Sequence, residues 1–422
     1  MTGVWAVLTG IGFFALIMAS IALHEVGHLV PAKLFGVKVP QYFVGFGKRI
    51  WSVRRGETEY GIKWLPLGGY VRLVGMYPPG RPGRRGRLAE LADSAREAER
   101  DDITDTDIRT NRLFYQKRTW QKLVIMAGGP LMNVLLAFLI FLGVNLAYGQ
   151  QQQTLTVAVV SDCLDPAPAA CVAPPAKQAG LKAGDTVVAL NGQTVSTWRQ
   201  LVTLVRAEGA GEIAFTVERP GQGRVTLPTV HGVLRQVVDL NDPSKTVTAG
   251  FAGMSSQVTT VRVGPVGTLK DMWTLTTQSV AALGTFPQKV FATGYDLVTG
   301  KPRDAAGPLS VVGATVAASE ISTTDRFTLG SRIASYFSLL GSVNLFVAIL
   351  NLVPLLPFDG GHIAGALWEA LRRAVARLFR RPDPGFFDTA RLLPVAYVVG
   401  AFLAIAGAIL VVADIVSPIR IL

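Results

Sequence analysis

The sequence predicts a polytopic α-helical membrane protein with four transmembrane helices, a membrane-associated β-hairpin or small sheet, and an inserted extracytoplasmic α+β domain. Half of the 422 residues are hydrophobic and only 17% are charged, and the mean hydropathy is +0.37. Four runs reach the length of about 20 apolar residues that a helix needs to cross the hydrocarbon core. Basic residues gather in two of the loops between these runs, as they do in cytoplasmic loops.

The four apolar runs cover residues 4 to 23, 123 to 147, 333 to 353 and 392 to 416. The first run lacks the basic start and the cleavage site of a signal peptide, so we expect it to be retained as a span. Arginine and lysine are frequent in residues 34 to 119 and in "LRRAVARLFRR" (371 to 381), which places both loops in the cytoplasm. Both termini and the long segment from 150 to 332 should then lie outside. This topology explains much of the net charge of +12, with contact of 371 to 381 with anionic lipid as an extra possibility, and gives no reason to expect nucleic acid.

The stretch "IALHEVGHLVPAK" places His24, Glu25 and His28 at the end of the first span. On a helix the two imidazoles emerge about one turn apart on one face, the spacing of a HExxH zinc site. In such a site the glutamate accepts a proton from the attacking water. The alternative is a pair of histidines that only satisfy interior hydrogen bonds. Ionisable groups in a span are costly and are usually functional, which favours the metal site.

A zinc site needs a third protein ligand, and the late motif "NLVPLLPFDGGH" offers Asp359. Pro354 and Pro357 should break the third span there, while Gly360 and Gly361 allow unusual backbone turns. The alternative role for Asp359 is to cap the following helix. His362 is a rival ligand, ranked below Asp359 because it lies past the glycine pair.

The segment from 37 to 76 alternates in polarity and contains a turn signal at "RRGETEYG" (54 to 61), which predicts a hairpin or small sheet near the cytoplasmic face. An edge of this sheet could pair with an unwound substrate through main-chain hydrogen bonds. The alternative is a structural hairpin that only seals the site. The acidic and basic stretch from 90 to 112 is expected to be a solvated linker.

The HEVGH motif, "YFVGFGKRIWSVRRGETEYGIKWLPLGGYVRLVGM" (42 to 76), "AGGPLMN" (127 to 133) and "NLVPLLPFDGGH" together resemble the site-two protease family of intramembrane zinc metalloproteases. The likeness spans nearly the whole chain and is greatest to the bacterial regulator-of-sigma branch, including its relatives with one PDZ domain. One departure is visible, because many members carry the second proline of the late motif one residue earlier than Pro357.

The resemblance implies one Zn²⁺ per chain, held by His24, His28 and Asp359, with Glu25 as general base. It implies that Asn351 holds the substrate backbone or helps to stabilise the oxyanion, although Asn351 could instead satisfy backbone groups freed by Pro354. The "GFG" at 45 to 47 matches the family's membrane-associated loop. The residues expected to contact substrate are Gly45, Phe46, Gly47, Gly68, Gly69, Tyr70 and Pro354.

Within the outer segment, "PPAKQAGLKAGDTVVALNGQTVSTWRQLVTLV" (174 to 205) resembles the core of a bacterial PDZ domain. Residues 187 to 190 suit a buried strand, "NG" a tight turn, and "TWRQLVTLV" a helix that begins at a threonine cap. The domain could dock a peptide or substrate ectodomain by strand addition, or could only exclude bulky substrates. Cys163 and Cys171 lie in this segment, where an oxidising exterior permits a disulfide between them.

These observations divide the chain into eight expected segments. The first four are a first transmembrane helix with HExxH (1 to 36), a cytoplasmic β-hairpin region and charged linker (37 to 119), a second transmembrane helix (120 to 149) and an extracytoplasmic PDZ-like domain (150 to 250). The last four are an extracytoplasmic amphipathic or gating segment (251 to 332), a third transmembrane helix with the late motif (333 to 362), a basic amphipathic cytoplasmic helix (363 to 391) and a fourth transmembrane helix (392 to 422).

The resemblance implies regulated intramembrane proteolysis in the bacterial plasma membrane, usually after a first cleavage outside it. The implied partners are single-pass membrane proteins, of which anti-sigma factors and signal-peptide remnants are examples, and the lipid bilayer. A membrane metal transporter or sensor using the same ligands is the main alternative. A proton acceptor beside the ligands and a peptide-binding domain both argue against it. An inactive scaffold is disfavoured by the intact motifs.

Overall fold

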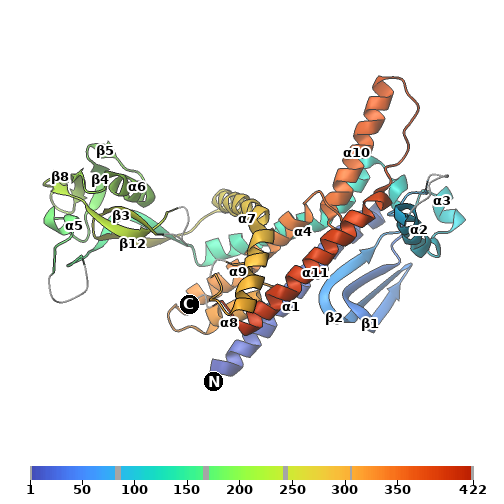
Figure 1. The fold of residues 1–422 in the computed structure, drawn as a ribbon, viewed down its shortest axis with the longest axis horizontal. Coiled ribbons are helices and arrows are strands. Elements are labelled where there is room, and N and C mark those ends of the chain that lie inside the picture. Colours follow the sequence, from blue (N-terminus) through green and yellow to red (C-terminus); the bar gives the residue numbers. More distant parts are fainter. Residues whose placement is uncertain (1, 81–86, 165–170, 241–245, 305–306, 420–422) are drawn as a thin grey trace. The chain divides into compact units, whose positions relative to one another are not determined.

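The computed structural model describes residues 2–80, 87–164, 171–240, 246–304 and 307–419. Within these ranges four helices are long and apolar enough to cross a membrane, which confirms the predicted number. They are α1 (Thr2–Leu34), α4 (Thr119–Ala147), α9 (Leu329–Asn351) and α11 (Leu393–Val416) (Figure 1). The chain divides into two compact units, one made of Met1–Val144 with Gly264–Leu422 and one made of Asn145–Val263.

The first unit contains further elements between the four apolar helices. They are β1 (Gln41–Arg55), β2 (Thr58–Arg72), α2 (Arg87–Arg100), α3 (Asp105–Arg109), the 3₁₀ turn η1 (Phe114–Gln116), α7 (Pro265–Thr299), α8 (Val311–Thr323), α10 (Asp359–Leu378) and the 3₁₀ turn η2 (Thr389–Leu392). The amphipathic segment expected before the third span contains the 35-residue helix α7 and the short apolar helix α8.

Helices α1 and α4 touch backbone to backbone at glycines. A methyl group built on Gly27 would lie 2.3 Å from the carbonyl oxygen of Gly128, and one built on Gly128 would lie 1.9 Å from the carbonyl oxygen of Gly27. Only glycine at both positions permits this distance, as is common where membrane helices cross closely. The crossing lies between His24 and His28 and therefore sets α4 beside the HEVGH motif.

The predicted hairpin is a more elaborate sheet than the sequence pattern suggests. Residues 41–44 pair with 59–62 on one side and with 69–72 on the other, while 49–55 pair with 58–63. The two long strands thus fold over themselves, and residues 69–72 lie at one edge. Apolar side chains at the other end of the sheet are exposed: Ile50, Trp51, Ile62, Trp64, Leu65 and Leu67.

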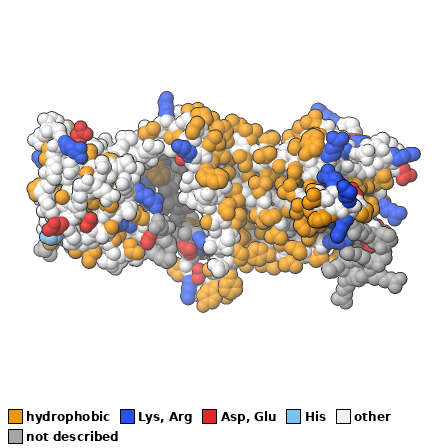
Figure 2. Space-filling model, turned by 90° about the horizontal axis from the view of Figure 1, so that it is seen from above, with side chains coloured by type: hydrophobic (Ala, Val, Ile, Leu, Met, Phe, Trp, Pro, Cys, Tyr) orange, Lys and Arg blue, Asp and Glu red, His pale blue; other side chains and the backbone are white. Residues whose placement is uncertain are grey.

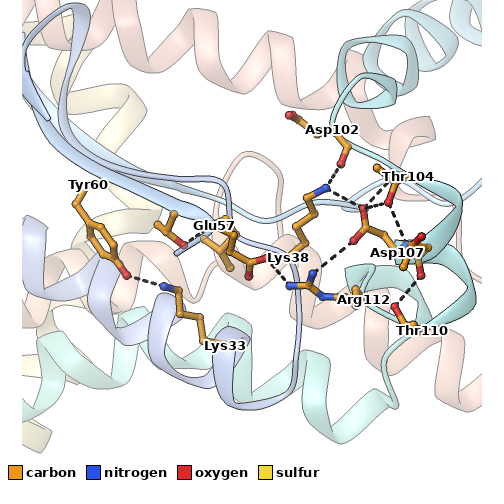
Figure 3. Close-up of polar contacts among 12 residues, drawn as sticks. Lys33, Lys38, Glu57, Tyr60, Asp102, Thr104, Asp107, Thr110 and Arg112 are labelled. Carbon is orange, nitrogen blue, oxygen red and sulfur yellow. Dashed lines mark hydrogen bonds and ion pairs between the residues drawn. The ribbon is translucent and has the colours of Figure 1, made fainter. Parts of the chain in front are cut away.

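The charged stretch after the sheet is largely exposed, as expected for a solvated linker, but its described part contains the helices α2 and α3. Thr104 caps α3 by accepting from the amide of Asp107, and the Asp107 carboxylate accepts from the amide of Thr104. Lys38 donates to Asp107 Oδ2 at 2.8 Å, and Arg112 donates to Glu57 at 2.5 Å (Figure 3). These ion pairs tie the segment to Lys38, which precedes β1, and to Glu57, which lies in the turn between β1 and β2.

The Asp107 carboxylate should make the stability of this region depend on pH. Burial opposes its ionisation, but Lys38 and Thr104 outweigh that effect and lower the pKa of Asp107 to about 2. Such a group stabilises the fold above its unfolded pKa of about 3.9, and the contribution is lost as the pH falls toward 2. We expect Asp107→Asn to lower the thermal midpoint at pH 5, and the difference from wild type to shrink as the pH falls from 5 to 2. A difference that stayed constant over that range would contradict the assignment.

The far end of α11 is joined to α8 by a buried carboxylate. Asp414 Oδ1 accepts from Arg303 Nη1 at 2.6 Å, and Oδ2 accepts from the backbone amides of Ser310 and Gly313 at 2.7 and 3.1 Å. The side chains of Arg303 and Asp414 are 4% and 1% exposed. A methyl group on Gly313 would lie 2.4 Å from Asp414 Oδ2, so glycine is required there. The pair fixes the loop after α7 and the start of α8 to α11.

The second unit is an α+β domain built on a sheet in the order β12-β3-β4-β7-β8, with β5 beside β4. Its elements are β3 (Gln150–Val160), α5 (Pro175–Gln178), β4 (Thr186–Leu190), β5 (Gln193–Thr194), α6 (Trp198–Glu208), β6 (Glu212–Ile213), β7 (Phe215–Arg219), β8 (Gly223–Thr226), β9 (Val230–His231), β10 (Val233–Val238), β11 (Thr246–Phe251) and β12 (Met254–Val261). The buried strand, the "NG" turn and the helix capped by Thr197 lie where the sequence predicts.

The second unit extends beyond the predicted boundary at residue 250. Strand β12 pairs with β3 from Met254 opposite Val160 to Val261 opposite Gln150, which makes it part of the sheet rather than of the segment that follows. The sequence pattern does not reveal this pairing because the partner strand lies about 100 residues earlier. Cys163 and Cys171 form a disulfide, with their Cα atoms 5.0 Å apart.

Candidate metal centre

The HEVGH motif lies on the last turns of α1, where His24 and His28 are both buried. Their Nε2 atoms are 3.2 Å apart. His28 Nδ1 lies 2.8 Å from the carbonyl oxygen of Ile125 on α4. Because a carbonyl can only accept, Nδ1 carries a proton, and in the neutral imidazole Nε2 then has the lone pair that faces the site. An oriented imidazole of this kind is the usual state of a metal-binding histidine.

Asp359, at the start of α10, places its carboxylate beside the Nε2 atoms of His24 and His28. Helix α9 ends at Asn351, and α10 begins at Asp359 after a non-helical segment that contains Pro354 and Pro357. The N-cap of α10 is Phe358 rather than Asp359, so the structure gives no support to the capping alternative. Asp359 Oδ2 lies 3.4 Å from His24 Nε2 and 3.3 Å from His28 Nε2.

The glycine pair after Asp359 explains how α10 can begin there. A methyl group on Gly360 would lie 2.3 Å from the carbonyl oxygen of Val353, and one on Gly361 would lie 2.7 Å from the amide nitrogen of Leu356. Both glycines have ordinary helical dihedral angles, so they allow close packing rather than the unusual turns that the sequence suggests. The start of α10 is thereby folded tightly against the segment that precedes it.

The donor set fits zinc. Among the described residues, His24, His28 and Asp359 are the group whose ligand atoms converge in this way. The separations of 3.2 to 3.4 Å match the roughly 3.3 Å between ligand atoms of a tetrahedral zinc with bonds of about 2.0 to 2.1 Å. The lone pair of His28 Nε2 faces a carboxylate oxygen, an arrangement of two acceptors that a cation stabilises.

Gly129 of α4 lies against the two imidazoles. A methyl group built on it would lie 2.2 Å from His28 Nε2 and 2.7 Å from His24 Nε2. Both distances are far shorter than a van der Waals contact, so a side chain at this position would displace the imidazoles or α4. The space beside the ligand atoms therefore depends on the absence of a side chain at residue 129.

The three ligand candidates face a cavity of about 690 Å³ in the helical unit. Glu25 and Asn351 line it, as do the predicted substrate contacts Phe46, Gly68, Gly69 and Tyr70. Gly45, Gly47 and Pro354 are not among its lining residues. Gly45 has a φ of +90° and a methyl group there would lie 2.8 Å from the carbonyl oxygen of Lys63, which is a structural requirement of the sheet. His362 also lines the cavity but does not join the converging ligand atoms.

Sequence reasoning missed several residues that shape this cavity. They are Ile21, Leu73, Met76, Met126 and Val347, together with Gly129 beneath the imidazoles. The apolar ones cannot be distinguished from ordinary core positions by pattern. Gly129 did carry a signal, because two adjacent glycines inside an apolar run that is expected to be helical lower its helix propensity and call for a packing reason.

Comparison with known proteins agrees with this geometry. The profile of Peptidase family M50 matches residues 12–380. The chain is 33% identical over 440 aligned positions to zinc metalloprotease Rip1 of Mycobacterium tuberculosis, covering 98% of both chains. It is 32% identical to zinc metalloprotease Rip1 of Mycolicibacterium smegmatis, again over 98% of both chains.

A more distant relative is metalloprotease MmpA of Caulobacter vibrioides, which is 27% identical over 85% of both chains. The M50 profile covers most of the sequence, from the apolar run before HEVGH to the basic end of α10. The chain is therefore an integral membrane zinc metalloprotease that belongs to peptidase family M50, the site-two protease family.

Proposed function

We propose that this protein is an intramembrane endopeptidase that cuts single-pass membrane proteins with one zinc ion held by His24, His28 and Asp359. The observation that carries the proposal is the convergence of these three ligand atoms beside Glu25, in a cavity of the unit that contains the apolar helices. When bound, zinc polarises the scissile carbonyl and makes water a competent nucleophile near neutral pH.

Glu25 is the proposed general base. It follows His24 on α1 and lines the same cavity, so its carboxylate can accept a proton from the attacking water and return it to the leaving amine. Asn351 lines the cavity at the end of α9. Its side-chain amide could donate a hydrogen bond to the oxyanion or to the substrate backbone. If it does, replacing Asn351 should lower kcat, whereas a purely structural role would leave kcat unchanged.

A membrane helix hides its carbonyl groups in its own hydrogen bonds, so the substrate must be unwound before it can be cut. The proposed receptor for the unwound strand is the sheet edge at residues 69–72, whose other edge is already paired with 41–44. A methyl group built on Gly69 would lie 3.1 Å from Cγ of Glu25, so the edge passes directly beside the proposed base. Main-chain pairing at this edge would bind substrates of varied sequence.

The membrane topology belongs to the same proposal. The basic loops after α1 and after α9 lie in the cytoplasm of the bacterial plasma membrane, and both termini and the second unit lie outside. The exposed apolar side chains of the sheet, including Trp51 and Trp64, suit a membrane-associated hairpin. Candidate substrates are anti-sigma factors and remnant signal peptides, cut after a first external cleavage.

The second unit is proposed to act as a PDZ-like docking domain or size filter. A groove of about 190 Å³ lies between α6 and the segment Gly250 to Met254, and Trp198, Val202 and Val205 line its helical side. The opposite side of the groove is formed by Val237 of β10, the end of β11 and Met254, the first residue of β12. A docked peptide could therefore contact α6 on one side and the end of β11 on the other.

The test of the proposal is cleavage of a purified single-pass model helix in liposomes, before and after removal of metal with a zinc chelator. We expect cleavage by the untreated enzyme, loss of cleavage after chelation, and recovery when zinc is added back. Cleavage that survives complete zinc removal would contradict the assigned chemistry. Zinc flux across the liposome membrane without cleavage, also with a substrate trimmed on the outside, would favour a transporter.

A further inference from the structure

Helix α10 has one face packed against the protein and one face that packs against nothing in the described part of the chain. On the packed face, Glu369 accepts from Lys122 of α4 at 3.1 and 3.2 Å and from the backbone amide of Phe387 at 3.0 Å. On the other face, six large apolar side chains are exposed over three turns: Leu367, Trp368, Leu371, Val375, Leu378 and Phe379. Their spacing makes one continuous stripe on the helix surface.

The second half of α10 and the three residues that follow it are strongly basic. Residues 371–381 contain five arginines and no acidic residue: Arg372, Arg373, Arg377, Arg380 and Arg381. Arg373 is paired within the protein, because it contacts Asp383 and also Glu369, which binds Lys122 as well. The basic character of the exposed face therefore rests on the other four arginines. Basic side chains accordingly cluster at this end of the apolar surface (Figure 2). A partner for this face must be apolar and anionic at once.

The position of the stripe indicates which partner that is. Lys122 lies in the first turn of α4, so its contact with Glu369 places the middle of α10 at the end of a span. Trp120 and Val124 of the same turns of α4 are 52% and 44% exposed. The rest of α10 projects past the neighbouring helices (Figure 1). The exposed stripe therefore begins at the level where α4 begins, in the region where headgroups are expected, which is also where tryptophans such as Trp368 are enriched.

We propose that the exposed face of α10 binds anionic phospholipid, with its apolar stripe at the boundary of the acyl chains and its arginines on the headgroup phosphates. Arginine binds phosphate through two parallel hydrogen bonds, and an amphipathic basic helix gains affinity from both terms. Helix α10 is not among the candidate spans, so contact with the surface of the membrane is the arrangement that buries its stripe. The proposal depends on the four apolar helices spanning a bilayer and not on the catalytic assignment.

A single thiol label can measure this contact. The only two cysteines of the sequence, Cys163 and Cys171, form a disulfide, so Leu378→Cys provides one reactive thiol. Leu378 is 77% exposed, and its replacement should leave the packing of α10 unchanged. The full-length protein carrying a fluorophore at this position is placed in vesicles of phosphatidylcholine alone or of phosphatidylcholine with phosphatidylglycerol. Quenching by brominated acyl chains reports lipid contact, and quenching by iodide reports exposure to water.

We expect brominated lipid to quench the label strongly when phosphatidylglycerol is present. Replacing Arg377, Arg380 and Arg381 by glutamine should shift the balance toward iodide quenching by a factor on the order of 100, because each arginine near an anionic surface contributes about a fivefold factor. The matched variant with lysine at these three positions retains the charge and should retain lipid contact.

Two results would overturn the proposal. The first is equal lipid quenching with and without phosphatidylglycerol, which would leave no role for anionic headgroups. The second is a label that iodide reaches in both kinds of vesicle. If that label were nevertheless shielded in native membranes, an acidic protein partner would replace lipid as the ligand of this face.

Discussion

Replacing Gly129 by alanine should abolish zinc binding while the four apolar helices remain folded. The added methyl group would lie 2.2 Å from His28 Nε2 and 2.7 Å from His24 Nε2, so the imidazoles could not keep their separation. Zinc tolerates deviations of only about 0.2 Å in its ligand distances. We expect zinc content to fall from about one ion per chain to a few per cent of that value.

Zinc per chain can be measured by elemental analysis of the purified protein, with size-exclusion chromatography as the check on folding. Gly143→Ala is the matched control, because Gly143 lies on the same helix and a methyl group there would have no atom within 4 Å. The control should bind zinc as the wild type does. An alanine variant at position 129 with full zinc occupancy would show that the site lies elsewhere or adapts freely. Absence of zinc from the wild type would instead contradict the ligand assignment itself.

Replacing Glu25 by glutamine should eliminate cleavage but not zinc binding. Glutamine has nearly the same shape as glutamate but cannot accept the proton of the attacking water at neutral pH. Loss of a positioned general base costs roughly 10² to 10⁴ in rate. His24, His28 and Asp359 are unchanged in this variant, and their ligand atoms would still converge.

Cleavage of the model helix and zinc content should be measured on the same preparation. Glu97→Gln provides the control for a change of charge alone, because Glu97 is exposed on α2. If Glu25→Gln cut the substrate at the wild-type rate, another residue of the cavity would have to serve as base. If it lost zinc, Glu25 would have a role in holding the metal.

The four spans and the candidate ligands could be predicted from sequence because each depends on local chemistry. A run of about 20 apolar residues forms a helix in lipid, because the helix satisfies the backbone hydrogen bonds within the segment. His24, His28 and Asp359 are conspicuous because charged or ionisable groups are rare at membrane depth. The structure brings these three residues together from α1 and from the start of α10, which are more than 300 positions apart in the chain.

The features that could not be predicted depend on contacts between distant segments. Residues 41–44 pair with 59–62 on one side and with 69–72 on the other, and the alternating pattern of a strand does not identify either partner. The ordering of residues 104–112 depends on Lys38 and Glu57, which neutralise a segment whose composition alone suggests disorder. Gly129 was visible as a glycine, but its role follows only from the crossing of α1 and α4 at Gly27 and Gly128.

The buried pair of Arg303 and Asp414 has a consequence for biosynthesis. An aspartate in an apolar helix opposes insertion into the membrane. The residues that compensate it, Arg303 and the amides at the start of α8, are synthesised about 100 positions before Asp414. The receptor for the last helix is thus already present when that helix emerges. A substitution of Arg303 would accordingly lower the amount of fully inserted protein in the membrane, because α11 would fail to insert in a fraction of the chains.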